Sequence, residues 1–200
     1  MKLSYSIRYW PNRDWAQFCT AAVDAKLSGL EIDSVKNPVL TQRSSPTNPE
    51  LAAAARRQLA AKDLTVPCVG TAADLMSPEA EDEIASALEA AANLLVPYVV
   101  LRTVCDDGEA VKERLTPLVA RAEKAGVTLL LESAGAMADT RRLVDVLDYF
   151  ACDHLAACWN AHSRPSPTWG PTSGTCASPT APPSARRSWW ARACCPCGSS

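Results

Sequence analysis

The chain has 200 residues, of which 48% are hydrophobic and 21% charged, and this is the composition of one ordinary globular domain. Twenty basic and twenty-two acidic side chains leave a net charge of −2, so no overall field attracts nucleic acid or an anionic membrane surface. The first ten residues lack the apolar core of a signal peptide, and no apolar run reaches the roughly 18 residues of a membrane span. We therefore expect a cytoplasmic protein.

Short β-rich runs alternate with longer helical patterns along the first 160 residues or so. Strands are predicted at 3–7, 29–32, 64–69, 98–101, 127–131 and 155–159. Helices are predicted at 14–26, 49–62, 79–95, 107–125 and 140–150, with Asp14, Asn48 and Asp139 as N-caps and Gly126 just past a helix end. This alternation is typical of a parallel sheet built from β/α units.

Six such units predict an incomplete (β/α)8 TIM barrel over residues 1–163, since a complete barrel has about 250 residues. The structural alternative is a doubly wound open sheet. No glycine-rich turn of the kind that binds a dinucleotide follows the first predicted strand. We therefore expect the barrel.

In such barrels the active site lies at the carboxyl ends of the strands. The polar residues that follow the predicted strands are Arg8, Glu31, Asp33, Arg102, Glu132, Asn160 and His162. Glu132 follows a five-residue apolar strand directly, and carboxylates in such places bind Mg²⁺ or Mn²⁺. The alternative interpretation is that Glu132 forms an ion pair with Arg102.

Other strand-end residues also have two interpretations. Glu31 and Asp33 share one face of a strand, so they either point into the mouth of the barrel or line a solvated loop. His162 is a metal ligand, an acid or base, or only the end of a strand. Trp10 and Trp159 are sugar-stacking platforms or core residues.

Four segments carry a family likeness. They are Ser4-Tyr5-Ser6-Ile7, Gly29-Leu30-Glu31-Ile32, Leu129-Leu130-Leu131-Glu132 and Trp159-Asn160-Ala161-His162. In this order they resemble the strand ends of the xylose-isomerase-like sugar phosphate isomerase/epimerase family, over about four fifths of the chain. The resemblance implies a TIM barrel that moves a proton next to a carbonyl of a sugar or sugar phosphate, assisted by Mn, Mg or Zn.

The resemblance also implies residue roles. Glu132 matches the first metal ligand of the family, and His162 matches a further ligand; we take both as catalytic. Asn160 stands where the family has Asp, and its uncharged amide predicts weaker metal binding. Glu31, Arg102 and Trp10 are then substrate-binding residues. The remaining family ligands belong to strands seven and eight, which the sequence does not reveal, and six strands argue against activity of the chain as written.

Residues 164–200 form a tail rich in Pro, Ser, Trp and Cys without helical or strand periodicity, and we expect it to be disordered and not native to the barrel. Its three tryptophans and four cysteines are unusual for a disordered segment. A single-base shift of the reading frame turns 169–180 and 189–197 into strings that resemble the family. We therefore hypothesise a frameshift, which the nucleotide sequence of the gene tests.

Two further functions remain open at this stage. A metal-free barrel that binds carbohydrate, as a homo-oligomer or within a larger protein, is the alternative from the binding class. The phosphodiesterase branch of the same superfamily needs a His-rich metal cluster and a basic groove, which two histidines and a charge of −2 disfavour. We expect a small sugar or sugar phosphate as partner, and neither nucleic acid nor membrane.

Overall fold

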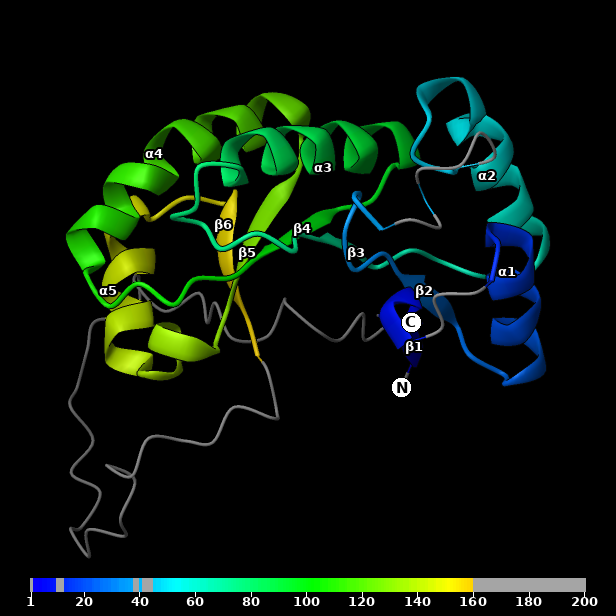
Figure 1. Ribbon diagram of the computed structural model, residues 1–200, viewed down its shortest axis with the longest axis horizontal. Coiled ribbons are helices and arrows are strands. Elements are labelled where there is room, and N and C mark those ends of the chain that lie inside the picture. Colours follow the sequence, from blue (N-terminus) through cyan, green and yellow to red (C-terminus); the bar gives the residue numbers. More distant parts are fainter. Residues whose placement is uncertain (1, 10–12, 38–39, 41–44, 160–200) are drawn as a thin grey trace, which may run out of the picture.

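The computed structural model describes residues 2–9, 13–37, 40 and 45–159, and strands alternate with helices throughout (Figure 1). The strands are β1 (Ser4–Ser6), β2 (Gly29–Glu31), β3 (Cys68–Gly70), β4 (Tyr98–Leu101), β5 (Thr128–Glu132) and β6 (Leu155–Cys158). The helices are α1 (Trp15–Asp24), α2 (Pro49–Ala61), α3 (Ala80–Leu94), α4 (Gly108–Ala125) and α5 (Thr140–Phe150). Two short 3₁₀ helices, η1 (Ile7–Tyr9) and η2 (Gly135–Ala138), follow β1 and β5.

Each described strand is parallel to the next strand along the chain. β1 pairs with β2, and β3, β4, β5 and β6 pair in that order. Two isolated bridges, Gly29 to Thr65 and Ile32 to Val69, join β2 to the β3 segment. A doubly wound sheet reverses its strand order at a switch point, whereas this order contains no reversal. The fold is therefore a partial TIM barrel, with the helices in an arc outside the strands (Figure 1).

Side chains placed at the helix ends explain where the helices begin and stop. The Asp14 carboxylate accepts a hydrogen bond of 2.8 Å from the Gln17 amide, and the Asp14 amide donates one of 2.9 Å to Gln17 Oε1, which is a complete capping box. Asn48, Asp107 and Asp139 cap α2, α4 and α5, each by accepting a hydrogen bond from a backbone amide in the first turn. Gly126 ends α4 with a φ of 66°, a backbone conformation that glycine adopts without strain.

The third strand differs most from the prediction. We expect it at 64–69, but it covers Cys68–Gly70. Pro67 lies in the predicted strand and has no N–H to donate, so it interrupts the ladder. Thr65, before the proline, contributes only its bridge to Gly29.

The hydrophobic core lies between the strands and the helices. Val99, Leu101, Leu129 and Leu131 alternate along β4 and β5 and are at most 1% exposed. They belong to one core cluster with side chains of α3 and α4 such as Leu115. Burying each of these leucines stabilises the fold by about 1.5–3 kcal/mol. The intervening residues face the other side of the sheet, which is the barrel interior.

The cysteines of the described segments form no disulfide bonds. Burial raises the pKa of the Cys19 thiol to about 11, so this group behaves as a small apolar side chain. No helix within the described ranges is both long and apolar enough to cross a membrane. The predicted tail at 164–200 lies outside the described residues.

Candidate functional site at the carboxyl ends of the strands

Charged side chains stand at the carboxyl ends of β1, β2, β4 and β5. Glu31 is the last residue of β2 and Glu132 the last of β5, whereas Arg102 directly follows β4 and Arg8 lies in η1 after β1. The register of β4 and β5 aligns Leu101 with Leu131, so Arg102 and Glu132 are neighbours across two strands. Because parallel strands end at the same edge, these predicted site residues gather at one end of the barrel.

The environment of Glu31 reflects this gathering. Burial raises the pKa of the Glu31 carboxyl, and the negative charges of Asp33 and Glu132 raise it further. The guanidinium groups of Arg102 and Arg8 act in the opposite direction but do not cancel the rise. Glu31 therefore takes up a proton more readily than an ordinary glutamate, which suits a group that donates a hydrogen bond to a ligand.

Arg102 lies within electrostatic range of Glu31. Within the described part of the chain, it forms no ion pair with Glu31 or Glu132, although ion pairs of 2.7–2.8 Å occur between helices elsewhere. Its Nε is buried, and among the described residues no acceptor lies within hydrogen-bond distance. The simple ion pair between Arg102 and Glu132, considered above as an alternative, does not form.

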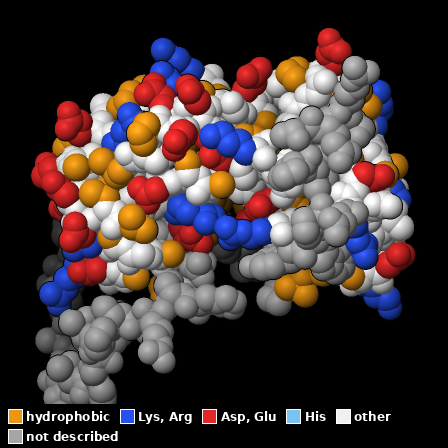
Figure 2. Space-filling view, viewed as in Figure 1, with side chains coloured by type: hydrophobic (Ala, Val, Ile, Leu, Met, Phe, Trp, Pro, Cys, Tyr) orange, Lys and Arg blue, Asp and Glu red, His pale blue; other side chains and the backbone are white. Residues whose placement is uncertain are grey.

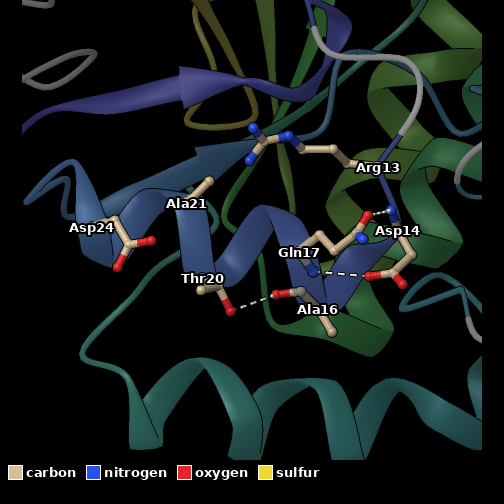
Figure 3. Close-up of a pocket in the computed structure, with 7 residues that line it drawn as sticks. All are labelled: Arg13, Asp14, Ala16, Gln17, Thr20, Ala21 and Asp24. Carbon is tan, nitrogen blue, oxygen red and sulfur yellow. Dashed lines mark hydrogen bonds between the residues drawn. The ribbon is translucent and has the colours of Figure 1, made fainter.

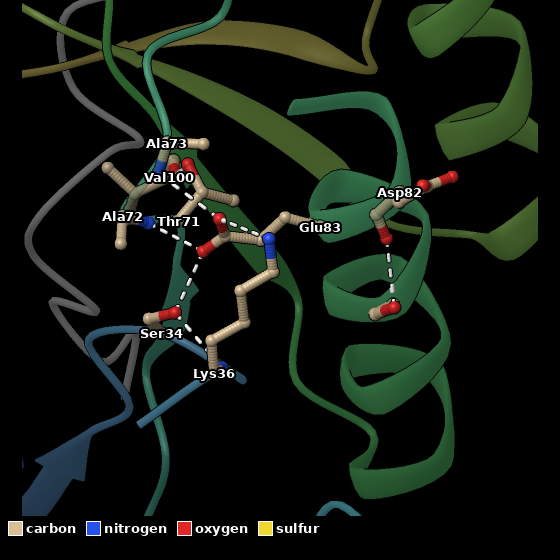
Figure 4. A network of polar contacts seen from close by, with 9 residues as sticks. Ser34, Lys36, Thr71, Ala72, Ala73, Asp82, Glu83 and Val100 are labelled. Carbon is tan, nitrogen blue, oxygen red and sulfur yellow. Dashed lines mark hydrogen bonds and ion pairs between the residues drawn. The ribbon is translucent and has the colours of Figure 1, made fainter. Parts of the chain in front are cut away.

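A buried carboxylate that the sequence analysis does not single out supports this end of the barrel. Glu83, in the first turn of α3, is 1% exposed. It accepts hydrogen bonds from the Ala72 amide at 2.6 Å, the Ala73 amide at 3.1 Å and the Ser34 hydroxyl at 2.8 Å (Figure 4). Lys36 completes the network with an ion pair of 3.6 Å.

Glu83 joins the loop after β2 to the loop after β3, because Ser34 and Lys36 belong to the first and the two amides to the second. Burial alone would raise the pKa of Glu83, but these hydrogen bonds and the Lys36 charge together hold it below its ordinary value. The sequence does hold a signal, since Glu83 shares the apolar helix face of Ala80 and Ala87.

The loop after β2 also lies close to β3. A Cβ atom on Gly70 would come within 2.5 Å of the Asp33 carbonyl oxygen, so this approach requires glycine. The Asn37 side chain donates a hydrogen bond of 2.9 Å to the Asp33 carboxylate. Asp33 is thereby held beside Glu31 at the strand end.

Of the predicted metal ligands, the structure describes only Glu132; Asn160 and His162 lie outside the described residues, as does the predicted substrate residue Trp10. Glu132 offers the hard oxygen donor that Mg²⁺ or Mn²⁺ prefers, and its negative charge acts on the nearby Glu31. It fits the role of one ligand. Within the described ranges no three His, Cys, Asp or Glu side chains are close enough to complete a metal site.

Cys158 is a further residue at this end that the sequence analysis does not identify as part of the site. It pairs in register with Glu132, so both side chains project from the same face of the sheet.

On the face shown in Figure 2, acidic and basic side chains lie side by side around a hollow near the middle.

A shallow surface pocket lies along α1, apart from these strand ends (Figure 3). Its lining residues are Arg13, Asp14, Ala16, Gln17, Thr20, Ala21 and Asp24. Several of its polar groups are already used within the helix: Asp14 and Gln17 form the capping box, and Thr20 donates to the Ala16 carbonyl at 3.0 Å. We therefore assign the candidate site to the strand ends.

No protein-family model matches the sequence, and no curated protein matches it. Solved structures do match over about 78% of the chain, and several of them are described as xylose isomerase domain proteins or xylose isomerase-like TIM barrel proteins. The fold is thus that of a xylose isomerase-like TIM barrel, as the sequence resemblance implies.

Three of these structures illustrate the likeness. A D-tagatose 3-epimerase-like protein has a TM-score of 0.61 and 15% identity, over 80% of this chain and 64% of its own. The IolI protein, solved with a zinc atom, has a TM-score of 0.61 and 14% identity, over 78% and 62%. A Mycobacterium smegmatis protein in complex with magnesium has a TM-score of 0.58 and 13% identity, over 78% and 63%. The chain spans about three fifths of the length of these proteins.

Proposed function

We propose that the chain is part of a sugar or sugar-phosphate isomerase or epimerase that transfers a proton next to a carbonyl group with the help of a divalent metal. The observation that carries this proposal is the convergence of Glu31, Arg102 and Glu132 at the carboxyl ends of three parallel strands. The occurrence of zinc and magnesium in structures of the same fold supports the metal.

Each residue has a distinct role in the proposal. Glu132, Asn160 and His162 hold the divalent ion, which when bound supplies Lewis-acid polarisation of a carbonyl. Glu132 or His162 moves the proton. Glu31 and Arg102 orient the substrate through hydrogen bonds to its oxygen atoms, and Trp10 packs against the sugar ring.

Two measurements on the purified 200-residue chain test the proposal. The first is the amount of Mn²⁺ retained after dialysis, by elemental analysis, together with the melting temperature with and without Mn²⁺ or Mg²⁺. We expect stoichiometric metal and a higher melting temperature with metal, because a ligand that binds only the folded state stabilises it. The second is deuterium uptake from D₂O at the carbon next to the carbonyl of D-fructose or D-fructose 6-phosphate, by NMR.

Matched variants separate the site from general effects of charge. Glu132→Gln should lose both the retained metal and the shift in melting temperature, whereas Glu89→Gln, an exposed carboxylate on α3, should keep both. Retention of metal by Glu132→Gln would contradict the proposed ligand. Sugar binding without metal and without deuterium uptake would instead identify a metal-free carbohydrate-binding barrel.

A further inference from the structure

Two guanidinium groups at the strand ends form no side-chain hydrogen bond or ion pair with the residues that the structure describes. Neither Arg102 nor Arg8 has a side-chain hydrogen bond or ion pair within the described part of the chain, and the buried Nε of Arg102 lacks an acceptor. A buried donor without an acceptor costs free energy in the unliganded protein. A ligand that supplies an acceptor at this position recovers that loss.

The backbone that carries Arg102 is fixed on both sides. Leu101, just before it, is 1% exposed in β4, and Thr103, just after it, is 2% exposed. The Arg102 carbonyl accepts a hydrogen bond of 2.9 Å from the Leu75 amide. The root of the side chain is therefore positioned before any ligand arrives, which lowers the entropy lost on binding.

The charge balance of the site indicates the kind of acceptor. Glu31 lies within electrostatic range of two further carboxylates, Asp33 and Glu132, and of the guanidinium groups of Arg102 and Arg8. A divalent cation bound at Glu132 would change the net charge of these five side chains from negative to positive. The site would then favour a ligand with one anionic group. The planar fork of arginine matches a carboxylate or a phosphate, with two parallel hydrogen bonds.

We propose that Arg102, assisted by Arg8, forms an oxyanion subsite, so that this site takes sugars carrying a carboxylate or phosphate group in preference to neutral sugars. The inference rests on the proposed function, because it assigns the substrate class of the same site. Arg102 binds the anionic group directly, and Arg8 adds electrostatic attraction from the end of β1.

The test is calorimetric titration of the full chain, in the presence of Mn²⁺, with D-fructose, D-gluconate, D-fructose 6-phosphate and inorganic phosphate. We expect one anionic sugar to bind roughly tenfold or more tightly than fructose, on the scale of one charge-assisted hydrogen-bond pair. Preference for gluconate identifies a carboxylate and preference for fructose 6-phosphate identifies a phosphate. Inorganic phosphate binding as tightly as the sugar phosphate would mean simple ion binding and would overturn the subsite.

Arg102→Gln should abolish the preference for the anionic sugar over fructose, and Arg102→Lys should restore only part of that preference, because an ammonium group lacks the planar fork. Arg57→Gln, an exposed arginine of α2, is the matched control and should keep the preference. A thermal melt of each variant establishes that it folds. If Arg102→Gln does not fold, Arg102→Lys tests the subsite in its place.

The outcomes separate this inference from the proposed function. Equal binding of neutral and anionic sugars, or a preference that survives Arg102→Gln, overturns the subsite even where Glu132 binds metal. Binding of anionic sugars through Arg102 without metal at Glu132 supports the subsite and contradicts the proposed function. Binding of none of the four probes overturns the subsite as well.

Discussion

Glu31 and Glu83 are two partly or fully buried carboxyls whose pKa values shift in opposite directions. Burial and neighbouring carboxylates raise the pKa of Glu31, whereas hydrogen bonds to the Ala72 and Ala73 amides and the Ser34 hydroxyl outweigh burial and lower that of Glu83. Ionised Glu31 therefore destabilises the folded chain at neutral pH, and ionised Glu83 stabilises it. The proposed binding residue and the structural residue are thus distinguished by the direction of their pKa shifts.

Glu31→Gln should raise the melting temperature at pH 7. A raised folded pKa means that the destabilisation is present above that pKa and disappears as the pH falls through it, so the gain should shrink towards pH 4. A gain on the order of 2 °C is expected, since 1 kcal/mol shifts the melting of a domain of this size by about 2–4 °C. Calorimetric scans across this pH range, with Glu89→Gln as control, measure it; a lower melting temperature at pH 7 would contradict the account.

Glu83→Gln should lower the free energy of unfolding at pH 7 by about 1–3 kcal/mol, because a buried charge-assisted network loses its charge. The depressed pKa of Glu83 gives stability that is present above its unfolded value, 4.5, and is lost as the pH falls through the folded value. Urea unfolding should therefore separate wild type and variant at pH 7, and the two curves should converge in acid. A constant difference at all pH values would argue against an ionised Glu83.

At the scale of elements, the helices follow from the sequence more closely than the strands. Asn48 followed by Pro49 and Asp139 followed by Thr140 mark the starts of α2 and α5 because capping is a local interaction. The ends of a strand, in contrast, depend on which residues of the neighbouring strands it pairs with, and these residues are distant in sequence. For this reason β3 is displaced beyond Pro67.

The cap of α4 offers a direct measurement. Asp107 accepts hydrogen bonds from the amides of Glu109 and Ala110 at 3.0 and 3.2 Å. Asp107→Ala should lower the free energy of unfolding by about 1 kcal/mol, because these amides lose their acceptor. The adjacent exposed Asp106, changed to Ala, supplies a control of equal charge and should have little effect in urea unfolding. Equal losses in the two variants would mean that charge rather than capping acts here.

Some features of the candidate site can be predicted from the sequence, and others require the structure. The sequence alone predicts that Glu31, Arg102 and Glu132 meet, because each follows an apolar strand and parallel strands end at one edge. It does not reveal the network of Glu83, whose partners come from two loops distant in sequence. Nor does the sequence reveal that Arg102 Nε lacks a partner among the described residues, since this depends on which acceptors are near in space.

On the scale of the whole molecule, the hypothesis that residues 164–200 are not part of the barrel leads to a simple comparison. Deleting them should leave the melting temperature within about 1 °C, because a segment that packs against nothing contributes little to stability. Differential scanning calorimetry of the chain ending at residue 163 beside the full chain measures this. A melting temperature several degrees lower in the shortened chain would mean that the tail packs against the barrel, and would contradict the hypothesis.

The succession of strands has one more consequence. Every described strand after the first finds its partner in the unit that precedes it, so the residues that stabilise a unit have already been made when that unit leaves the ribosome. β5, for example, can align on β4 without waiting for any later segment. The chain can therefore fold in step with its own synthesis, and the order in which its parts become stable follows the order of translation.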